Sequence, residues 1–132
     1  MNKDKLFMRT IKSIEGLHDG SNEVLITFMD GARIRQYHSQ DCCEYVRVAQ
    51  VDGIIDKHIG ATIYELQEKV SYKGDPGIKD LNEEEESVTY AFYTLKTSKG
   101  YLDWRWTGES NGYYSEDVEC ELDEHTKKNV NK

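Results

Sequence analysis

The sequence predicts an α+β fold that is mostly antiparallel β, a meander of hairpins with one or two short helices. Three observations predict it. Asp30-Gly31 separates two runs of alternating side chains, which is the strongest short hairpin signal. Residues 87–97 are rich in Val, Tyr, Phe and Thr, the residue types that strands favour. The run 101–106 then alternates polar and apolar side chains, with both tryptophans on one face.

Alternation of side chains also predicts the strands of the first half. They are expected at residues 10–14, 23–29, 32–38 and 44–51, the first of them on a weak signal. In the last of these strands, strict alternation places Val46 and Val48 on one face and Val51 on the other.

The segment after Asp52-Gly53 is the place where helix is expected. Residues 54–59 are short and end at Gly60, which suits one or two helical turns with a glycine cap. Residues 61–72 carry apolar spacings that fit a helix and β-branched residues that fit a strand; we favour extended structure there.

The second half is predicted to be a consecutive antiparallel meander of 87–97, 101–106 and 113–119. Trp104 is expected to be buried and Arg105 to face away from it. The whole is predicted as one domain over 1–122, with an acidic loop at 73–86 and a frayed tail at 123–132.

Charge is unevenly distributed along the 132 residues, which carry a net charge of −8. Residues 75–126 hold 14 acidic and only four basic side chains. Such a surface repels a nucleic-acid duplex and attracts a basic partner. No apolar run approaches the roughly 20 residues of a membrane span, and no secretory signal is recognisable. We therefore expect a cytoplasmic protein that binds neither membrane nor duplex.

The three cysteines are expected to be reduced. Cys42 and Cys43 are adjacent and Cys120 is distant, which is a poor disulfide framework. Neighbouring side chains on a strand point to opposite faces, so we expect no bond between Cys42 and Cys43 and burial of at least one of them.

The segment from His38 to Glu44 is the first candidate site. His38, Cys42 and Cys43 are potential ligands of a transition metal, or a thiol nucleophile with its base. The spacing lacks a Cys-x-x-Cys pair, and the plainer interpretation is a buried cysteine beside a polar turn. We therefore predict no metal and no cofactor.

The region around the second half of the meander is the second candidate site. Arginine can grip phosphate or carboxylate, and aromatic rings can stack on a ligand or anchor a protein partner. The alternative is a purely structural hairpin with a buried tryptophan face, in which Arg105 pairs with Asp103 or Glu116. The candidate binding residues are Arg105, Trp106, Glu109, Asn111, Tyr113, Tyr114 and Glu116.

Two motifs together resemble a family of small uncharacterised proteins found in bacteriophages, prophages and bacteria. They are the His38–Glu44 segment, HSQDCCE, and the Gly108–Glu116 segment, GESNGYYSE. The resemblance covers about residues 10–119 and carries no activity to any residue. It implies a small acidic accessory protein of a phage or mobile element, a class whose members often counter host defence.

The function predicted on these grounds is that of a non-enzymatic, anti-CRISPR-like inhibitor of a host antiviral defence system. Its acidic surface would contact a nucleic-acid-binding effector, with Trp106, Tyr113 and Tyr114 as anchors. The acidic residues are Glu83, Glu84, Glu85, Glu86 and the range 116–124. Two alternatives remain: a sponge for a nucleotide second messenger, with a site completed across a homo-oligomer interface, and a metal- or thiol-dependent hydrolase.

Overall fold

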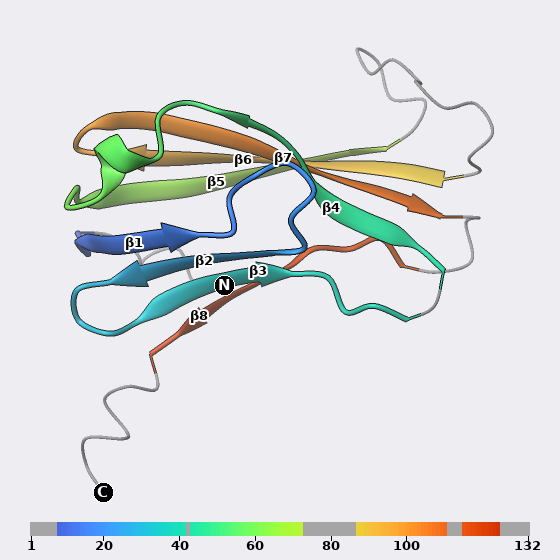
Figure 1. Ribbon diagram of the computed structural model, residues 1–132, viewed down its shortest axis with the longest axis horizontal. Coiled ribbons are helices and arrows are strands. Elements are labelled where there is room, and N and C mark those ends of the chain that lie inside the picture. The colour runs from blue at the N-terminus through green and yellow to red at the C-terminus, as the bar shows by residue number, and fades with distance from the viewer. Residues whose placement is uncertain (1–7, 42, 73–86, 111–114, 125–132) are drawn as a thin grey trace, which may run out of the picture.

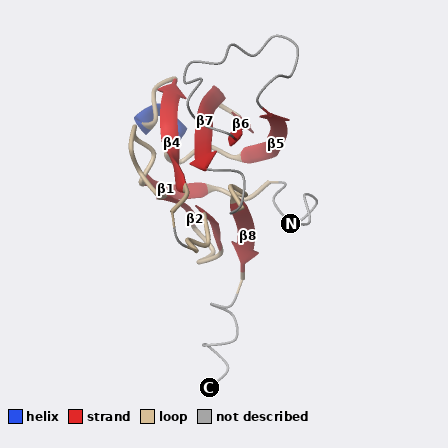
Figure 2. Ribbon diagram, turned by 90° about the vertical axis from the view of Figure 1, so that its right-hand side faces the viewer, coloured by secondary structure: helices blue, strands red, loops and turns tan. Residues whose placement is uncertain are grey.

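Two four-stranded antiparallel sheets pack face to face in a computed structural model of the chain, which describes residues 8–41, 43–72, 87–110 and 115–124 (Figure 1; Figure 2). The first sheet has the order β1-β2-β3-β8 and the second the order β4-β7-β6-β5. The strands are β1 (Ile11–Glu15), β2 (Glu23–Phe28), β3 (Arg33–Tyr37), β4 (Tyr45–Asp52), β5 (Ile63–Tyr72), β6 (Ser87–Thr97), β7 (Gly100–Ser110) and β8 (Glu119–Asp123).

The core lies between the two sheets and follows from the period of two along each strand. In β2 and β3 the inward positions are apolar apart from Gln36, and Ile26, Phe28 and Ile34 are fully buried. The second sheet contributes the larger side chains, among them Trp104, whose ring stacks on that of Tyr93 with centroids 5.8 Å apart. The expected burial of Trp104 is confirmed, and Arg105 lies on the opposite face of β7.

One buried polar side chain, Gln36 on β3, connects the two sheets. Its Oε1 accepts hydrogen bonds from the indole Nε1 atoms of Trp104, at 2.9 Å, and Trp106, at 3.1 Å. Its Nε2 lies 3.7 Å from Sγ of Cys120 on β8. A buried indole N–H requires an acceptor, so a single amide satisfies both tryptophans. Burial raises the pKa of the Cys120 thiol, which keeps it protonated.

Two of the hairpins that the local sequence predicts are present. Between β2 and β3, Asp30 Oδ1 accepts the Ala32 N–H at 3.0 Å, and Gly31 takes a φ of 91°, where glycine carries no steric cost. β6 and β7 pair from Thr97 with Gly100 to Ser87 with Ser110 around a two-residue turn. The extended structure expected for 61–72 is confirmed as β5.

The α+β class with one or two short helices is wrong. Among the described residues the helical structure is one 3₁₀ turn of three residues, η2 (Asp56–His58). Gly53 and Gly60 both take positive φ and bound the segment, leaving too few residues for an α-helix to develop. The architecture is a β-sandwich.

The third strand of the expected meander is also misplaced. β8 begins at Glu119 and pairs with β3 in the first sheet, whereas β7 is flanked by β6 and β4. The free side of β7 is taken by β4, which buries Val46 and Val48 there. Asp123, assigned to the frayed tail, is the last residue of β8 and forms an ion pair with Arg33 at 3.8 Å.

A β-bulge explains a further error in β4. The register with β7 shifts between Val48 and Gln50, and Val51 then lies opposite Trp104. An extra residue in one strand reverses the faces beyond it. Val51 therefore packs against the core with Val46 and Val48, not on the opposite face.

The buried side chain of His58 predicts a pH dependence of stability. Its Nδ1 lies 2.7 Å from Thr97 Oγ1, and Nε2 lacks a hydrogen-bond partner among the described residues. Burial, and secondarily the charge of Lys57, lowers the pKa of His58. The unfolded chain then takes up a proton at a higher pH than the folded protein, so the free energy of unfolding should fall as pH drops below about 6.5.

Urea unfolding at a series of pH values checks this expectation. His58→Gln, which cannot take up the proton, should lose less stability on acidification than the unsubstituted protein. The exposed His18 offers the control: His18→Gln should keep the original slope. Equal slopes for the protein and His58→Gln would contradict the prediction.

Candidate functional site

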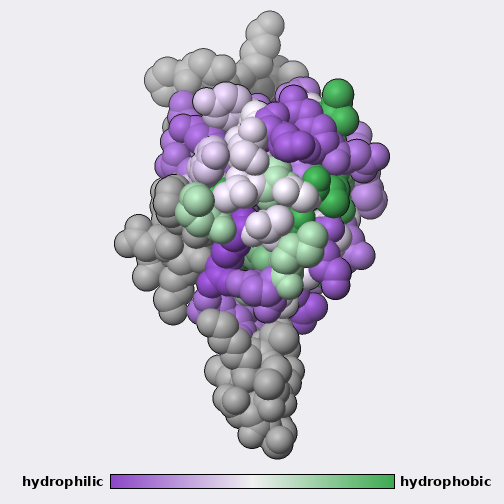
Figure 3. Space-filling model, turned by 90° about the vertical axis from the view of Figure 1, so that its left-hand side faces the viewer, coloured by the Kyte–Doolittle hydropathy of each residue, from purple (hydrophilic) through white to green (hydrophobic). Residues whose placement is uncertain are grey.

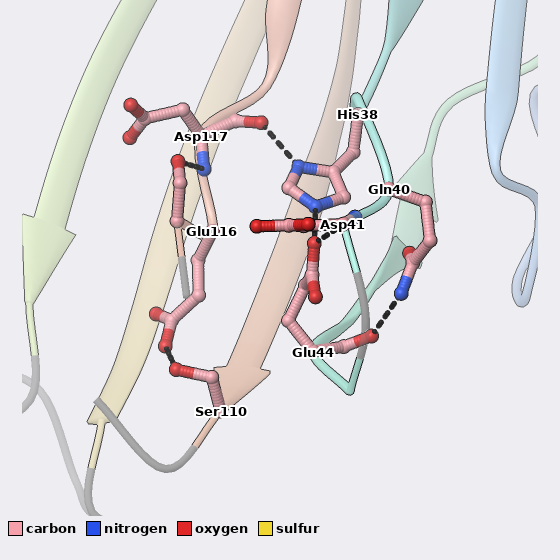
Figure 4. Close-up of polar contacts among 8 residues, drawn as sticks. His38, Gln40, Asp41, Glu44, Ser110, Glu116 and Asp117 are labelled. Atoms are coloured by element: carbon pink, nitrogen blue, oxygen red, sulfur yellow. Dashed lines mark hydrogen bonds and ion pairs between the residues drawn. The ribbon is translucent and has the colours of Figure 1, made fainter. Parts of the chain in front are cut away.

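The two sequence motifs meet at the end of the sandwich where β7 terminates (Figure 4). Tyr37 and Glu119 are partners in the β3–β8 ladder, so the residues that follow β3 lie beside those that precede β8. His38 Nδ1 consequently lies 2.7 Å from the carbonyl oxygen of Asp117. His38 and Asp117 are 79 residues apart in the chain, and this contact joins the first motif to the residue that follows the second.

His38 and Glu44 form a buried pair within the first motif. His38 Nε2 lies 2.7 Å from Glu44 Oε2, and the side chains are 4% and 0% exposed. The same carboxylate oxygen accepts the Asp41 N–H at 2.7 Å. Both ring nitrogens of His38 thus face oxygen atoms of the protein. The pair clamps the loop after β3, and neither nitrogen is available to a substrate.

Glu116 performs the equivalent role in the second motif. Its carboxylate accepts hydrogen bonds from the hydroxyls of Thr89, at 2.7 Å, and Ser110. Gly108 makes this approach possible, because a Cβ there would lie 2.8 Å from the Glu116 Cβ and 3.3 Å from Val46 Cγ2. The segment before β8 is therefore pressed onto the end of β7.

A pocket of about 300 Å³ opens between this segment and β5. Val70, Ala91, Tyr93 and Trp106 line it from the inner faces of β5, β6 and β7. Glu68, Glu116, Asp117 and Glu119 add four carboxylates, and the described lining contains neither lysine nor arginine. Figure 4 shows the Asp117 carboxylate directed away from His38, on the side where β5 runs. A cation with an apolar stem fits this lining.

Tyr93 fixes one of those carboxylates at the pocket floor. Its hydroxyl donates to Glu68 Oε2 at 2.6 Å. Burial, and secondarily the hydrogen bond to Glu68, raises the pKa of Tyr93, so the phenol stays a neutral donor. The carboxylate of Glu68 is thereby held at the edge of the inner face while the residue remains exposed.

The residues predicted to bind through the second half are spread over different parts of the molecule. Trp106 is 1% exposed and belongs to the core, so it cannot serve as a surface anchor. Glu109 lies on the outer face of the second sheet, 3.1 Å from Arg47 Nη2. Glu116 is the buried clamp described above. Asn111, Tyr113, Tyr114 and Glu83–Glu86 lie outside the described residues.

Arg105 lies on the outer face, remote from the inner pocket. Its Nε donates to Thr107 Oγ1 at 3.2 Å, and its guanidinium stands 5.6 Å from the Tyr90 ring centroid. The expected pairing with Asp103 or Glu116 is not formed. A shallow outer pocket of about 360 Å³ places Arg105 near Phe92, Asp52 and Asp103.

The expectation of reduced cysteines holds for Cys120 and is wrong for Cys43. Cys43 is exposed and disulfide-bonded, whereas Cys120 carries a free thiol. Cys42 lies outside the described residues, and with it the expectation about a bond between the two neighbours. Across the described part of the chain, no group of three His, Cys, Asp or Glu side chains could hold a metal ion.

Sequence reasoning missed Gln36 and Glu68. Each is a polar residue at an inward position of a strand. Gln36 shares a face with Ile34, which could have marked it as a buried acceptor for the tryptophans. Glu68 gave no such signal, because the register of 61–72 was not determined by its composition.

The opposite end of the sandwich is less suited to a specific site. The β2–β3 turn and the flanks of η2 carry the exposed Met29, Ile54 and Ile59. Figure 3 shows green apolar groups on this end interrupted by pale and purple polar ones. Scattered apolar side chains of this kind are ordinary surface.

Comparison with known proteins identifies a family for this fold and site. A family model described as a domain of unknown function, DUF7448, matches residues 4–120. The chain belongs to the DUF7448 family. The match includes both motifs and every residue that lines the acidic pocket, from Glu68 to Glu119. No curated protein and no solved structure matches the chain. None of the helices in the described DUF7448 chain has the length and apolarity needed to cross a membrane.

Proposed function

We propose that this DUF7448 protein is a non-enzymatic binding protein that holds a basic protein surface. The partner class is a nucleic-acid-binding effector of host antiviral defence, and binding inhibits it. The observation that carries the proposal is the pocket between β5 and the segment before β8, with four carboxylates and no base in its described lining. Basic grooves that bind phosphate are complementary to such a surface.

The run of acidic residues into β8 supports the same proposal. Residues 115–124 contain six carboxylates and no basic side chain. Asp117 and Glu119 are exposed beside the pocket. An acidic surface that occupies a basic channel competes with the phosphates the channel would otherwise bind. Tyr113 and Tyr114 immediately precede this segment and are proposed as its aromatic anchors.

The two alternative functions receive less support. A nucleotide would bring negative charge to a pocket of carboxylates. On the outer face, Asp52 and Asp103 accompany Arg105, which offsets its attraction for phosphate. A hydrolase centred on the first motif would need a free ring nitrogen, and both nitrogens of His38 face protein oxygens.

Neutralising the exposed pocket carboxylates tests the proposal. Asp117→Asn/Glu119→Gln should weaken binding to an effector at least about tenfold, which corresponds to ~1.4 kcal/mol. The measurement is the displacement of labelled DNA from purified CRISPR effector complexes by the protein. Raising salt from about 50 to about 300 mM should weaken inhibition steeply, because rim charges are screened.

A matched variant controls for net charge. Glu15→Gln/Asp19→Asn removes the same two charges from exposed positions that do not line the pocket, and it should inhibit normally. Neutralising Glu83–Glu86 tests the acidic loop in the same assay. Inhibition that is unaffected by the pocket variant, or absent across a panel of effectors, would defeat the proposal.

A further inference from the structure

β5 presents a long open edge beside the acidic pocket. It spans ten residues and is the last strand of the second sheet. On its outer edge, Ile63 donates to the Arg9 carbonyl at 2.8 Å and accepts from the Met8 N–H at 2.9 Å. From Glu65 to Tyr72, β5 is paired with β6, and no other described strand is paired with this stretch. Open edges are templates for strand addition, and proteins usually shorten or cover them.

The backbone groups at that edge can be identified from the register. Side-chain direction and hydrogen-bond direction both alternate along a strand. Ile63 faces the core and directs its backbone to the outer edge. The register shifts once, before Glu65, after which Leu66, Glu68 and Val70 lie opposite Leu95, Tyr93 and Ala91. These inward residues therefore also turn their N–H and C=O groups to the open edge.

The edge and the pocket share residues. Glu68 and Val70 line the pocket, and Val70 is 41% exposed. A strand added beside β5 would project every second side chain from the same face, toward Asp117 and Glu119. Inward carboxylates at this position disfavour an apolar strand and favour one that carries lysine or arginine.

We infer that an extended basic segment of the partner protein binds by adding a fifth strand to the second sheet at β5. Its backbone pairs with the open edge from Leu66 to Val70, and an inward lysine or arginine enters the pocket between Glu68 and Asp117. This mode of recognition couples main-chain hydrogen bonds with a pocket for alternate side chains. The inference rests on the proposed function and names how its partner is held.

A second copy of this chain is a poorer occupant of the same edge. Two β5 strands paired edge to edge would bring the Glu68 carboxylates, and the pockets behind them, toward each other. Like charges across paired strands are destabilising. A strand that carries lysine or arginine supplies the opposite charge.

The test uses two synthetic probes with the full chain. The first is a fluorescein-labelled octapeptide alternating lysine and threonine; the second has the same sequence with every backbone amide N-methylated. The charge is the same, but the methylated peptide cannot donate main-chain hydrogen bonds. We expect the first to bind and the second to bind at least tenfold more weakly by fluorescence anisotropy. Glu68→Gln should weaken the first at least fivefold.

Val70→Pro removes one edge-facing N–H and is compatible with an edge strand. It should abolish the difference between the peptides, with the melting temperature reporting whether the fold is retained. Equal binding of both peptides, dependent on Asp117 and Glu119, would overturn strand addition and leave the proposed function standing. No binding of either peptide by a protein that still inhibits an effector would also overturn it. Loss of peptide binding and effector inhibition together would defeat both.

Discussion

Gln36→Leu should lower the free energy of unfolding by about 3 kcal/mol or more, although the replacement is similar in volume. The change leaves the indole N–H groups of Trp104 and Trp106 buried without an acceptor. Each buried unsatisfied donor costs about 1–3 kcal/mol. Urea unfolding followed by tryptophan fluorescence measures the effect on the same side chains.

A glutamine on the surface provides the control for Gln36. Gln50 is exposed and contacts only Asp52 among the described partners of its side chain, at 3.2 Å. Gln50→Leu should change stability by less than about 0.5 kcal/mol. Comparable losses for the two variants would mean that the amide of Gln36 is not what joins the sheets.

Glu44→Ala should destabilise the protein by about 1–3 kcal/mol, because it leaves the Asp41 N–H and the facing ring nitrogen of the buried His38 side chain without their partner. His38→Ala should have a comparable cost for the converse reason. The double variant should cost clearly less than the sum of the two, since neither buried polar side chain is then left without the other. The measurement is a double-mutant cycle in urea.

Loss of the His38 side chain should also weaken binding to the partner. His38 carries a hydrogen bond to the Asp117 carbonyl, so its loss frees the segment that lines the acidic pocket. We expect His38→Ala to weaken effector inhibition under conditions where the variant stays folded. A cycle that is additive within about 0.5 kcal/mol would show that the two side chains act independently.

Local patterns of turn residues and alternating side chains were enough to predict most strands. They did not predict which distant strands pair with each other. The Asp30-Gly31 turn and the run from Ser87 to Thr97 carry their own signals, and both hairpins form as predicted. Nothing in residues 113–119 indicates that the following strand crosses to β3. That choice depends on which edge remains open once β4 has paired with β7.

The candidate site illustrates the same limit. The acidic range 116–124 and the first motif could be picked out by composition. Their meeting could not, because it depends on the β3–β8 register that places His38 beside Asp117. The bulge in β4 and the space that Gly108 leaves for Glu116 likewise depend on contacts between distant segments, so the local sequence does not predict them. Trp106 is buried in the core, so it is not a surface anchor.

The pairing of β3 with β8 has a consequence for how the chain folds during synthesis. Gln36 and Cys120 are 84 residues apart, so the first sheet closes only over a very long loop. Folds dominated by such distant pairings reach the native state on the order of milliseconds to seconds. On the ribosome, the first three strands must wait for the last one to emerge. The acidic pocket therefore forms only after β8 has been made, and a chain that terminates before residue 116 cannot present it to a partner.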